Sequence, residues 1–317
     1  MIRFLALAAL LALARAAEAQ EGTLRIVTGF PVGATLDLLA RLTAEGMRER
    51  LGRAVIVDNR TGAGGRIANE TVKAAPPDGS VLLLTPIATM AIYPHSLAGG
   101  LRYDPLRDYA PVAHLSSFQN GFGVNASVPA RTLAEYAALV RKDPRAGFYA
   151  SAAPGSIPHF LGVMFARAAG IELTHVAYKG TAPALQAIAA GEIAAISTVV
   201  ADIGTLVRSG KARMLATAGA KRSAISPDVP TFREQGFDVE GEGWYALFAP
   251  AGTLKAEIDR LSAAAVAAVR DPALRQKLEA LGLEPTGLGP AELAAIHKAD
   301  FDKWGPVIRA SGFKAAE

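Results

Sequence analysis

Short runs rich in β-branched residues alternate along this chain with alanine-rich amphipathic runs, and this alternation constrains the fold more than any other feature. The runs at 24–30, 54–60 and 80–86 have the length and composition of buried strands. The segments between them, at 35–50 and 67–75, repeat apolar residues at helical spacing. Strands that alternate with helices form βαβ units, so the sequence predicts an α/β protein with a mainly parallel sheet.

A second series of the same kind begins after Val112, and the two series contain too many βα units for one tidy sheet. We therefore expect two α/β lobes, the first completed by the C-terminal helices. Strand-like segments near 119–127 and 244–250 are expected to carry the chain between the lobes. The predicted division is a signal segment at 1–19, lobe I at 20–121 plus 244–317, and lobe II at 122–243, with the second boundary between about 215 and 245.

The first twenty residues have the features of a secretion signal. Arg3 supplies a positive charge, an apolar stretch follows, and Ala17-Glu18-Ala19 offers an A-x-A cleavage site. The apolar stretch, about a dozen residues, is too short to span a bilayer comfortably. A buried N-terminal helix is the less favoured alternative. We predict an exported chain that is cleaved near Ala19.

Composition argues against several classes of protein. The chain has no cysteine, which removes disulfides, a thiol nucleophile, thiolate metal sites and a lipoprotein anchor. The net charge is only +4 and no basic tract is present, so nucleic acid is a poor candidate partner. The histidines show neither H-x-x-x-H nor H-E-x-x-H spacing, which disfavours a zinc site. We expect no metal and no cofactor.

Two loops of similar design stand out, within "GFPVGATLDLLAR" at 29–41 and "FYASAAPGSIPHF" at 148–160. Each runs from a strand through a turn of small residues into the start of a helix. The first N–H groups of a helix and its dipole attract a carboxylate or phosphate without any cationic side chain. Thr35, Ser151 and Ser156 can add hydroxyl donors. One such loop alone is more often a tight βα turn, but a matching pair at the carboxyl ends of strands predicts a cleft for an anion.

Phosphate is the less favoured anion, because neither a G-x-x-x-x-G-K-[ST] run nor a G-x-G-x-x-G motif opens the first helix. Asp37 stands four residues before Arg41, which favours an ion pair within the helix over direct contact with a ligand. His159 follows the second loop and is equally suited to donating to a carboxylate or to packing. Lys179 is either a positive charge at the rim of the cleft or a solvated lysine.

Catalysis finds little support in the sequence. No G-x-S-x-G elbow is present, and the available nucleophiles are Ser151 or Ser156, with His159 as the base. No third group that would orient the histidine is identifiable. We therefore expect a protein that is not an enzyme, and an exported serine hydrolase is the alternative from another class.

Eight segments follow one another in an order that is far more specific than any single glycine loop. They are "FPVGATLDLLAR", "VIVDNRTGAGGRIANETV", "PPDGSVLLLTP", "YDPLRDYAPVA", "YASAAPGSIPHF", "HVAYKGTAPAL", "RSGKARMLATAGAKRSAISPDVPTFREQGF" and "WYALFAPAGT". With this set the chain, over about residues 23–305, resembles the extracytoplasmic substrate-binding proteins of tripartite tricarboxylate transporters, the Bug-type receptors.

The resemblance implies a periplasmic-binding-protein fold of type II, with two α/β lobes, two crossing strands and a ligand cleft between the lobes. It implies a monomer in the periplasm that closes over a small organic carboxylate like a Venus flytrap. The ligand would then be delivered to the membrane subunits of a tripartite tricarboxylate transporter. A receptor that reports to a signalling partner is an alternative that the sequence does not separate from this one.

In the family, backbone N–H groups and ordered waters at the two loops hold one ligand carboxylate. The resemblance carries these contacts onto the first lobe at Phe30, Val32, Gly33, Ala34, Thr35 and Asp37, and at Thr85, Pro86, Ile87, Ala88 and Thr89. On the second lobe it carries them onto Ser151, Ala152, Ala153, Gly155, Ser156 and His159, onto Tyr178, Lys179, Gly180 and Thr181, and onto Thr198 and Val199.

Some positions depart from the family pattern. The usual "PPGG" reads "PVGA" at 31–34, and a glycine of the second loop, within 148–160, is replaced by Ala153. The frequent "VDAMFDN" reads "IAAISTV" at 193–199, so acidic and amide groups are lost. We therefore expect a more apolar ligand, an aromatic or branched acid.

Overall fold

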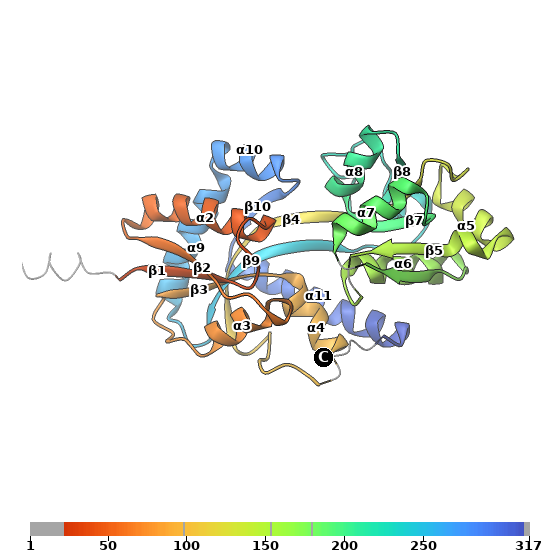
Figure 1. Cartoon of the computed structure of the whole chain (residues 1–317). Helices are drawn as coiled ribbons and strands as arrows, with labels where there is room; N and C mark the ends of the chain where they lie inside the picture. The colour runs from red at the N-terminus through yellow and green to blue at the C-terminus, as the bar shows by residue number, and fades with distance from the viewer. Residues whose placement is uncertain (1–21, 98, 153, 179, 314–317) are drawn as a thin grey trace, which may run out of the picture.

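The computed structural model describes residues 22–97, 99–152, 154–178 and 180–313. They form two α/β lobes that lie side by side and are joined by two strands, β4 and β9 (Figure 1). The predicted secretion signal and the cleavage site near Ala19 lie outside these residues. Within the described part of the chain, no helix combines the length and the apolar character needed to cross a membrane.

Lobe I contains the N-terminal βα units, and its strands lie in the order β2-β1-β3-β9-β4, with β10 paired to β4. The strands are β1 (Leu24–Thr28), β2 (Val55–Asn59), β3 (Val81–Pro86), β9 (Glu242–Pro250), β10 (Glu284–Leu288) and the first part of β4 (Tyr109–Asn125). Helices α2 (Thr35–Leu51), α9 (Lys255–Arg270) and α10 (Pro272–Ala280) cover one face, and α3 (Arg66–Lys73) packs on the other.

Lobe II contains the second series of βα units, in the strand order β4-β7-β5-β6, with β8 also paired to β4. The strands are β5 (Phe148–Ser151), β6 (Thr174–Ala177), β7 (Ala195–Val199) and β8 (Ala212–Thr217), and the helices are α5 (Leu133–Lys142), α6 (Ile157–Ala169), α7 (Thr181–Ala190) and α8 (Val200–Arg208).

The C-terminal helix α11 (Pro290–Ser311) packs against both lobes, on α4 (Tyr93–Ser96) in lobe I and on α6 in lobe II. Trp304 of α11 is fully buried, and its ring centroid lies 6.1 Å from that of Phe160. One hydrophobic core therefore runs from the α3 side of lobe I through α11 into lobe II. We retain the predicted lobe boundaries at 121 and 244 as a proposal, since they fall inside β4 and β9.

The sheet is mixed, which corrects the expectation of a mainly parallel one. Strand β1 is parallel to β2 and β3, and β5 is parallel to β6 and β7, as βα units require. Strands β4 and β9 run antiparallel to their neighbours. The parallel strands of both lobes end at the crossing. Strand β9 runs antiparallel to β3 of lobe I, and β4 runs antiparallel to β7 of lobe II.

Two strands differ from what the sequence predicts. Strand β4 begins at Tyr109, well before the expected 119. Its first half was not predicted, because it contains Pro111 and two adjacent serines, which are poor strand formers. Strand β10 was not foreseen, since Pro285 and Gly287 are poor strand formers. Both additions belong to lobe I, where pairing with β9 and β4 compensates for weak local propensity.

Candidate functional site

The register of the sheet brings the carboxyl ends of four strands to the crossing between the lobes. In lobe I the last residue of β3, Pro86, pairs with Tyr245, which pairs with Ser116 of β4. In lobe II the last residue of β7, Val199, pairs with Asn120 of β4. The path along β4 from Ser116 to Asn120 corresponds to about 13 Å of extended strand. Because β1 is parallel to β3 and β5 to β7, the two glycine- and serine-containing loops follow strands that end on opposite sides of this short gap.

The loop of lobe I, residues 29–34, is held from below by one buried carboxylate. Asp37 is fully buried and accepts from the Gly33 N–H at 2.9 Å. It also accepts from Arg41 Nε and Nη2, both at 3.0 Å, and from Asn59 Nδ2 at 2.9 Å. Asn59 Nδ2 donates in addition to the Phe30 carbonyl at 2.9 Å. Both halves of the loop are therefore tied to the same cluster.

Burial by itself would raise the pKa of Asp37, but the hydrogen bonds from Arg41, Gly33 and Asn59 outweigh it and hold the pKa below its usual range. The carboxylate is thus ionised and saturated with donors from the protein. The predicted ion pair with Arg41 is confirmed. The Asp37 oxygens position the loop, and the contact of Asp37 with a ligand, which the family resemblance implies, stays a prediction.

The start of α2 offers main-chain donors that no side chain caps. Ala34 is the N-cap residue, and it has no side-chain hydrogen bond to the helix. Val32 and Gly33 are exposed, and Thr35 is half-buried in the first turn. Gly33 has φ of +84°, which glycine adopts without strain, and a Cβ built there meets nothing within 4 Å. The outer side of this loop is therefore open.

The glycine run after Arg60 lies directly beneath the same loop. A Cβ on Gly29 would stand 2.4 Å from Gly65 Cα, so the two backbones are in direct contact. A Cβ on Gly65 would stand 3.0 Å from the Phe30 ring and 3.4 Å from Thr89 Cγ2. The glycine run therefore permits a close passage of backbone. It also places Phe30 beside the predicted segment 85–89.

The residues at 85–89 are largely engaged inside lobe I. They span the end of β3 and the start of a π-helical turn, η2 (Ala88–Ile92). Thr85 Oγ1 lies 2.6 Å from Thr89 Oγ1 and donates to Asn69 Oδ1 at 3.2 Å. Both hydroxyls are buried in a network of their own, and Ile87 belongs to the hydrophobic core. Among these five positions Ala88 alone is half-buried rather than buried.

The loop of lobe II, which runs from the end of β5 to the start of α6 and is called the serine loop below, is held by neutral side chains. Ser151 Oγ lies 2.7 Å from His175 Nε2, and His159 Nδ1 accepts from the Gly155 N–H at 3.0 Å. The two imidazole rings stack with their centroids 4.2 Å apart. Ser156 is the N-cap of α6 and accepts from the His159 N–H at 3.4 Å.

Burial lowers the pKa of both histidines. The pKa of His159 falls to about 4, with a smaller contribution from the neighbouring His175. The pKa of His175 is lowered as well. Both rings are therefore neutral near pH 7. Since His159 Nδ1 accepts from Gly155, its proton resides on Nε2, which remains a donor.

The segment after β6 lies against the serine loop. The Tyr178 N–H donates to the Ser151 carbonyl at 3.0 Å, and the Gly180 N–H donates to the Ala152 carbonyl at 3.1 Å. Gly180 is the N-cap of α7 and provides no side-chain cap, so Thr181 begins a second open helix start. The Tyr178 ring packs partly into the lobe II core. Ala153 and Lys179, also predicted at the ligand, lie outside the described residues.

Strand β7 ends with Thr198, which is buried, and Val199, which is half-buried and precedes α8. Thr198 Oγ1 donates to Asp202 Oδ2 at 3.4 Å. Burial raises the pKa of Asp202, and the Thr198 hydroxyl offsets part of this effect. Burial, together with the charge of Asp202, raises the pKa of Tyr245 in lobe I to about 12. The charge of Asp202 in lobe II thus acts on Tyr245 of β9.

The sequence did not identify Asn59, His175 or Asp202 as part of this region. Asn59 and His175 stand 22 and 24 residues from the groups that they contact, Asp37 and Ser151. Their only local signal is a polar side chain at or near the end of a strand, which is too common to select them. Asp202 lies three residues beyond the segment at 193–199, from which the acidic residue of the family pattern is absent.

A serine and a histidine do meet in lobe II, although not the pair considered from the sequence. Ser151 contacts His175, whereas the His159 ring accepts from the Gly155 main chain, and Ser156 accepts from the main-chain N–H of His159. The Ser151 side chain is fully buried, and among the described residues no carboxylate is hydrogen-bonded to His175. A nucleophile requires access and an oriented base, and neither is evident in this pair.

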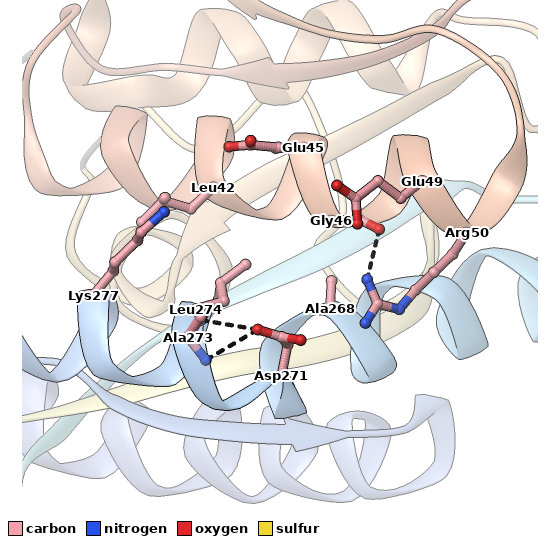
Figure 2. A pocket seen from close by; sticks show the side chains of 10 residues that line it. All are labelled: Leu42, Glu45, Gly46, Glu49, Arg50, Ala268, Asp271, Ala273, Leu274 and Lys277. Carbon is pink, nitrogen blue, oxygen red and sulfur yellow. Dashed lines mark hydrogen bonds between the residues drawn. The ribbon is translucent and has the colours of Figure 1, made fainter.

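A separate pocket lies on the outer side of lobe I, where α2 packs against α9 and α10 (Figure 2). Its volume is about 130 Å³, and Gly46 and Ala268 form its floor in close contact. Arg50 donates to the Gly46 carbonyl at 2.9 Å, and Asp271 caps α10. Arg50 and Asp271 are thus engaged by the helices themselves, and no lining residue of the pocket belongs to either loop.

Known proteins resemble this chain along most of its length. Residues 39–313 match the family described as the tripartite tricarboxylate transporter family receptor. The structure of Rpa4515 of R. palustris with adipate is 30% identical, covers 93% of this chain and 99% of that one, and has a TM-score of 0.79. MatC of Rhodopseudomonas palustris with bound malate is 30% identical over 90% and 98% of the two chains, with a TM-score of 0.74. The periplasmic binding protein BugD is 29% identical over 93% and 99%, with a TM-score of 0.75.

Proposed function

Because this chain belongs to the tripartite tricarboxylate transporter receptor family, and is thus a periplasmic solute-binding receptor, we propose that it captures a small organic carboxylate between its two lobes. The ligand carboxylate is held by main-chain N–H groups of the two loops rather than by a cationic side chain. Relatives solved with malate and with adipate support a small carboxylate as the ligand. The residues predicted from the sequence remain our assignment of the site.

One observation carries this proposal, namely the loop at 29–34 with its buried support. Asp37 and Asn59 hold the loop from inside, while Val32 and Gly33 are exposed and the start of α2 has no side-chain cap. Rigid main-chain donors at a helix start favour an anion, and preorganisation lowers the entropic cost of binding.

Binding of a carboxylate to both loops selects the closed arrangement of the lobes, because only that arrangement lets both sets of donors contact the ligand. The closed form is then recognised by the membrane subunits of a tripartite tricarboxylate transporter. The receptor acts as a monomer in this scheme. A receptor that signals its occupancy to a sensor would use the same cleft and the same closure.

Thermal unfolding of the mature protein against a panel of mono-, di- and tricarboxylates tests the proposal. A ligand present at about one hundred times its dissociation constant adds nearly 3 kcal/mol to the unfolding free energy, which raises the melting temperature by several degrees. A panel in which no carboxylate raises the melting temperature would contradict the proposal.

Two loop variants with matched controls locate the site. Gly33→Val introduces a side chain on the open side of the loop and should weaken the response to the best ligand at least tenfold in affinity. Gly52→Val at the other end of α2 imposes a comparable backbone strain, with φ of +64° and also no atom within 4 Å, and should leave that affinity unchanged. Equal loss in both variants would argue against the loop assignment.

Ser156→Ala removes a hydroxyl from the second loop and should also weaken binding, whereas Thr132→Ala removes the N-cap of α5 and should not. The hydrolase alternative is tested by a turnover assay on ester and amide substrates with the wild type and Ser151→Ala. Turnover that is lost in Ser151→Ala would favour the enzyme over the receptor.

A further inference from the structure

Asp202 is the acidic group that the structure places at the crossing and that neither loop uses. It lies in the first turn of α8, directly after the end of β7, so it belongs to the same edge of lobe II as the serine loop. The side chain is half-buried, and it accepts from the Thr198 hydroxyl at the long distance of 3.4 Å. Among the described residues no lysine, arginine or histidine forms an ion pair with it.

The same turn of α8 is where lobe II meets lobe I. A Cβ on Gly282, in the turn between α10 and β10, would stand 2.7 Å from the Ala201 Cβ. On the other side, the phenol of Tyr245 responds to the charge of Asp202. Tyr245 packs against Phe118, with ring centroids 4.8 Å apart, and both rings join the core that also contacts Phe30. The first turn of α8 therefore lies against lobe I, and the charge of Asp202 acts on Tyr245, which shares the lobe I core with Phe30.

This environment determines which ligand groups can bind favourably beside the Asp202 carboxylate. A partly desolvated carboxylate gains most from a hydrogen-bond donor or a positive charge, and a second carboxylate nearby is repelled. Among the described residues the hydrogen bond that the Asp202 carboxylate accepts is the long one from Thr198, so the carboxylate oxygens retain acceptor capacity.

Resting on the proposed function, we propose that Asp202 is a specificity-determining residue that selects carboxylates bearing a hydroxyl or ammonium group at the end opposite the bound carboxylate, and that it rejects dicarboxylates. The ligand carboxylate binds at the two loops, and its far end donates to Asp202. The sequence led us to expect an apolar ligand, since the acidic side chain of the family pattern is absent from 193–199. Asp202, in the first turn of the helix that follows, supplies an acidic side chain instead.

Isothermal titration with matched probes tests this inference. Each of three scaffolds, butanoate, hexanoate and benzoate, is used in three forms: unsubstituted, with a terminal hydroxyl or amino group, and with a terminal second carboxylate. On the best scaffold the wild type should bind the donor form at least about tenfold more tightly than the dicarboxylate, because the donor form makes a hydrogen bond to Asp202 where the dicarboxylate meets a like charge. In Asp202→Asn this ratio should fall to about one or below.

Two controls keep the result specific. Asp228→Asn removes the same charge from an exposed loop of lobe II and should leave the ratio as in the wild type. In a Lys179→Met background, Asp202→Asn should still lower the ratio, and disappearance of the effect there would show that Asp202 acts only by pairing with that lysine. If carboxylates bind but the ratio is the same in wild type and Asp202→Asn, this inference fails while the proposed function stands. If no probe of any form binds, the proposed function fails.

Discussion

The loop of lobe I is held by an ion cluster, whereas the loop of lobe II is held by neutral side chains. In lobe I the ionised Asp37 gathers donors from Gly33, Arg41 and Asn59. In lobe II the uncharged imidazoles of His159 and His175 hold the loop instead. Two loops with similar sequence design therefore depend on groups that titrate in different pH ranges. The two halves of one binding site should respond differently to mutation and to acid.

The largest expected effect is the loss of the lobe I cluster. Asp37→Ala leaves the Gly33 N–H, the Asn59 amide and Arg41 without their shared acceptor, which should lower the unfolding free energy by about 3 kcal/mol. Asp259→Ala breaks an exposed i,i+4 pair with Lys255 on α9 and should cost no more than about 0.5 kcal/mol. Urea unfolding at pH 7 measures both. Similar costs for the two variants would mean that the Asp37 cluster does not brace the loop.

The next effect is a difference between the two loops in how their contributions to the unfolding free energy depend on pH. The native pKa of His159, about 4, lies below its unfolded value, so the unfolded state binds more protons between about pH 6.5 and pH 4. Its contribution is complete above pH 6.5 and is lost as the pH falls, and the loss reaches about 2.5 kcal/mol at pH 4.5. The native pKa of Asp37 is lowered, so its contribution persists over this range and is lost only as the pH falls through that lower value.

Urea unfolding of the wild type and His159→Gln at pH 7.5 and 4.5 checks this difference. The stability lost between the two pH values should be about 2.5 kcal/mol smaller in His159→Gln. Asp37→Asn should leave the loss as in the wild type, since Asp37 does not titrate in that window. A pH response that His159→Gln leaves unchanged would show that the lobe II loop is not the acid-sensitive one.

A third prediction compares the stability cost of replacing two glycines with positive φ, one in each loop. Gly33→Ala and Gly155→Ala should each cost about 1–2 kcal/mol for the left-handed backbone. Gly155→Ala should cost more than Gly33→Ala, because its Cβ would stand 2.7 Å from the Phe313 ring while that of Gly33 meets nothing. A double-mutant cycle with Phe313→Ala, read by urea unfolding, should remove the excess. An excess that survives without the Phe313 ring would refute this explanation.

The smallest expected effect concerns the N-cap of α6. Ser156→Ala should lower the unfolding free energy by about 0.5–1 kcal/mol, since its bond to the His159 N–H is long at 3.4 Å. Thr132→Ala, with a bond of 3.1 Å to the Glu135 N–H, should cost at least as much. Thermal unfolding without ligand compares them. A Ser156→Ala cost well above that of Thr132→Ala would mean that Ser156 supports the whole loop rather than one helix end.

Much of the fold was accessible from the sequence, because βα alternation is a local pattern. The order of strands and helices, the two lobes and the crossing segments were predicted from runs that each span fewer than twenty residues, and the structure confirms them. The full length of β4 and the existence of β10 were not, since Pro111, Pro285 and Gly287 conceal strands that only pairing stabilises. The family resemblance carried by the eight sequence segments is confirmed by the family match.

The candidate site divides in the same way. The two loops and their position at helix starts were predicted, because a strand, a turn of small residues and a helix start adjoin in the sequence. The groups that hold them, Asn59 and His175, were not, since each contacts a residue more than twenty positions away. Asp202 was not identified, because Tyr245, the residue of lobe I on which its charge acts, is far from it in the sequence.

The amino-acid sequence alone specifies which segments become strands and helices and where loops with open N–H groups begin, because these properties depend on neighbours within one or two turns. The packed fold sets which charges and hydroxyls meet at those loops, how far apart the strand ends lie on β4, and which acid faces the gap. Contacts of that kind depend on the path of the whole backbone and on burial, and burial exists only once the lobes have packed.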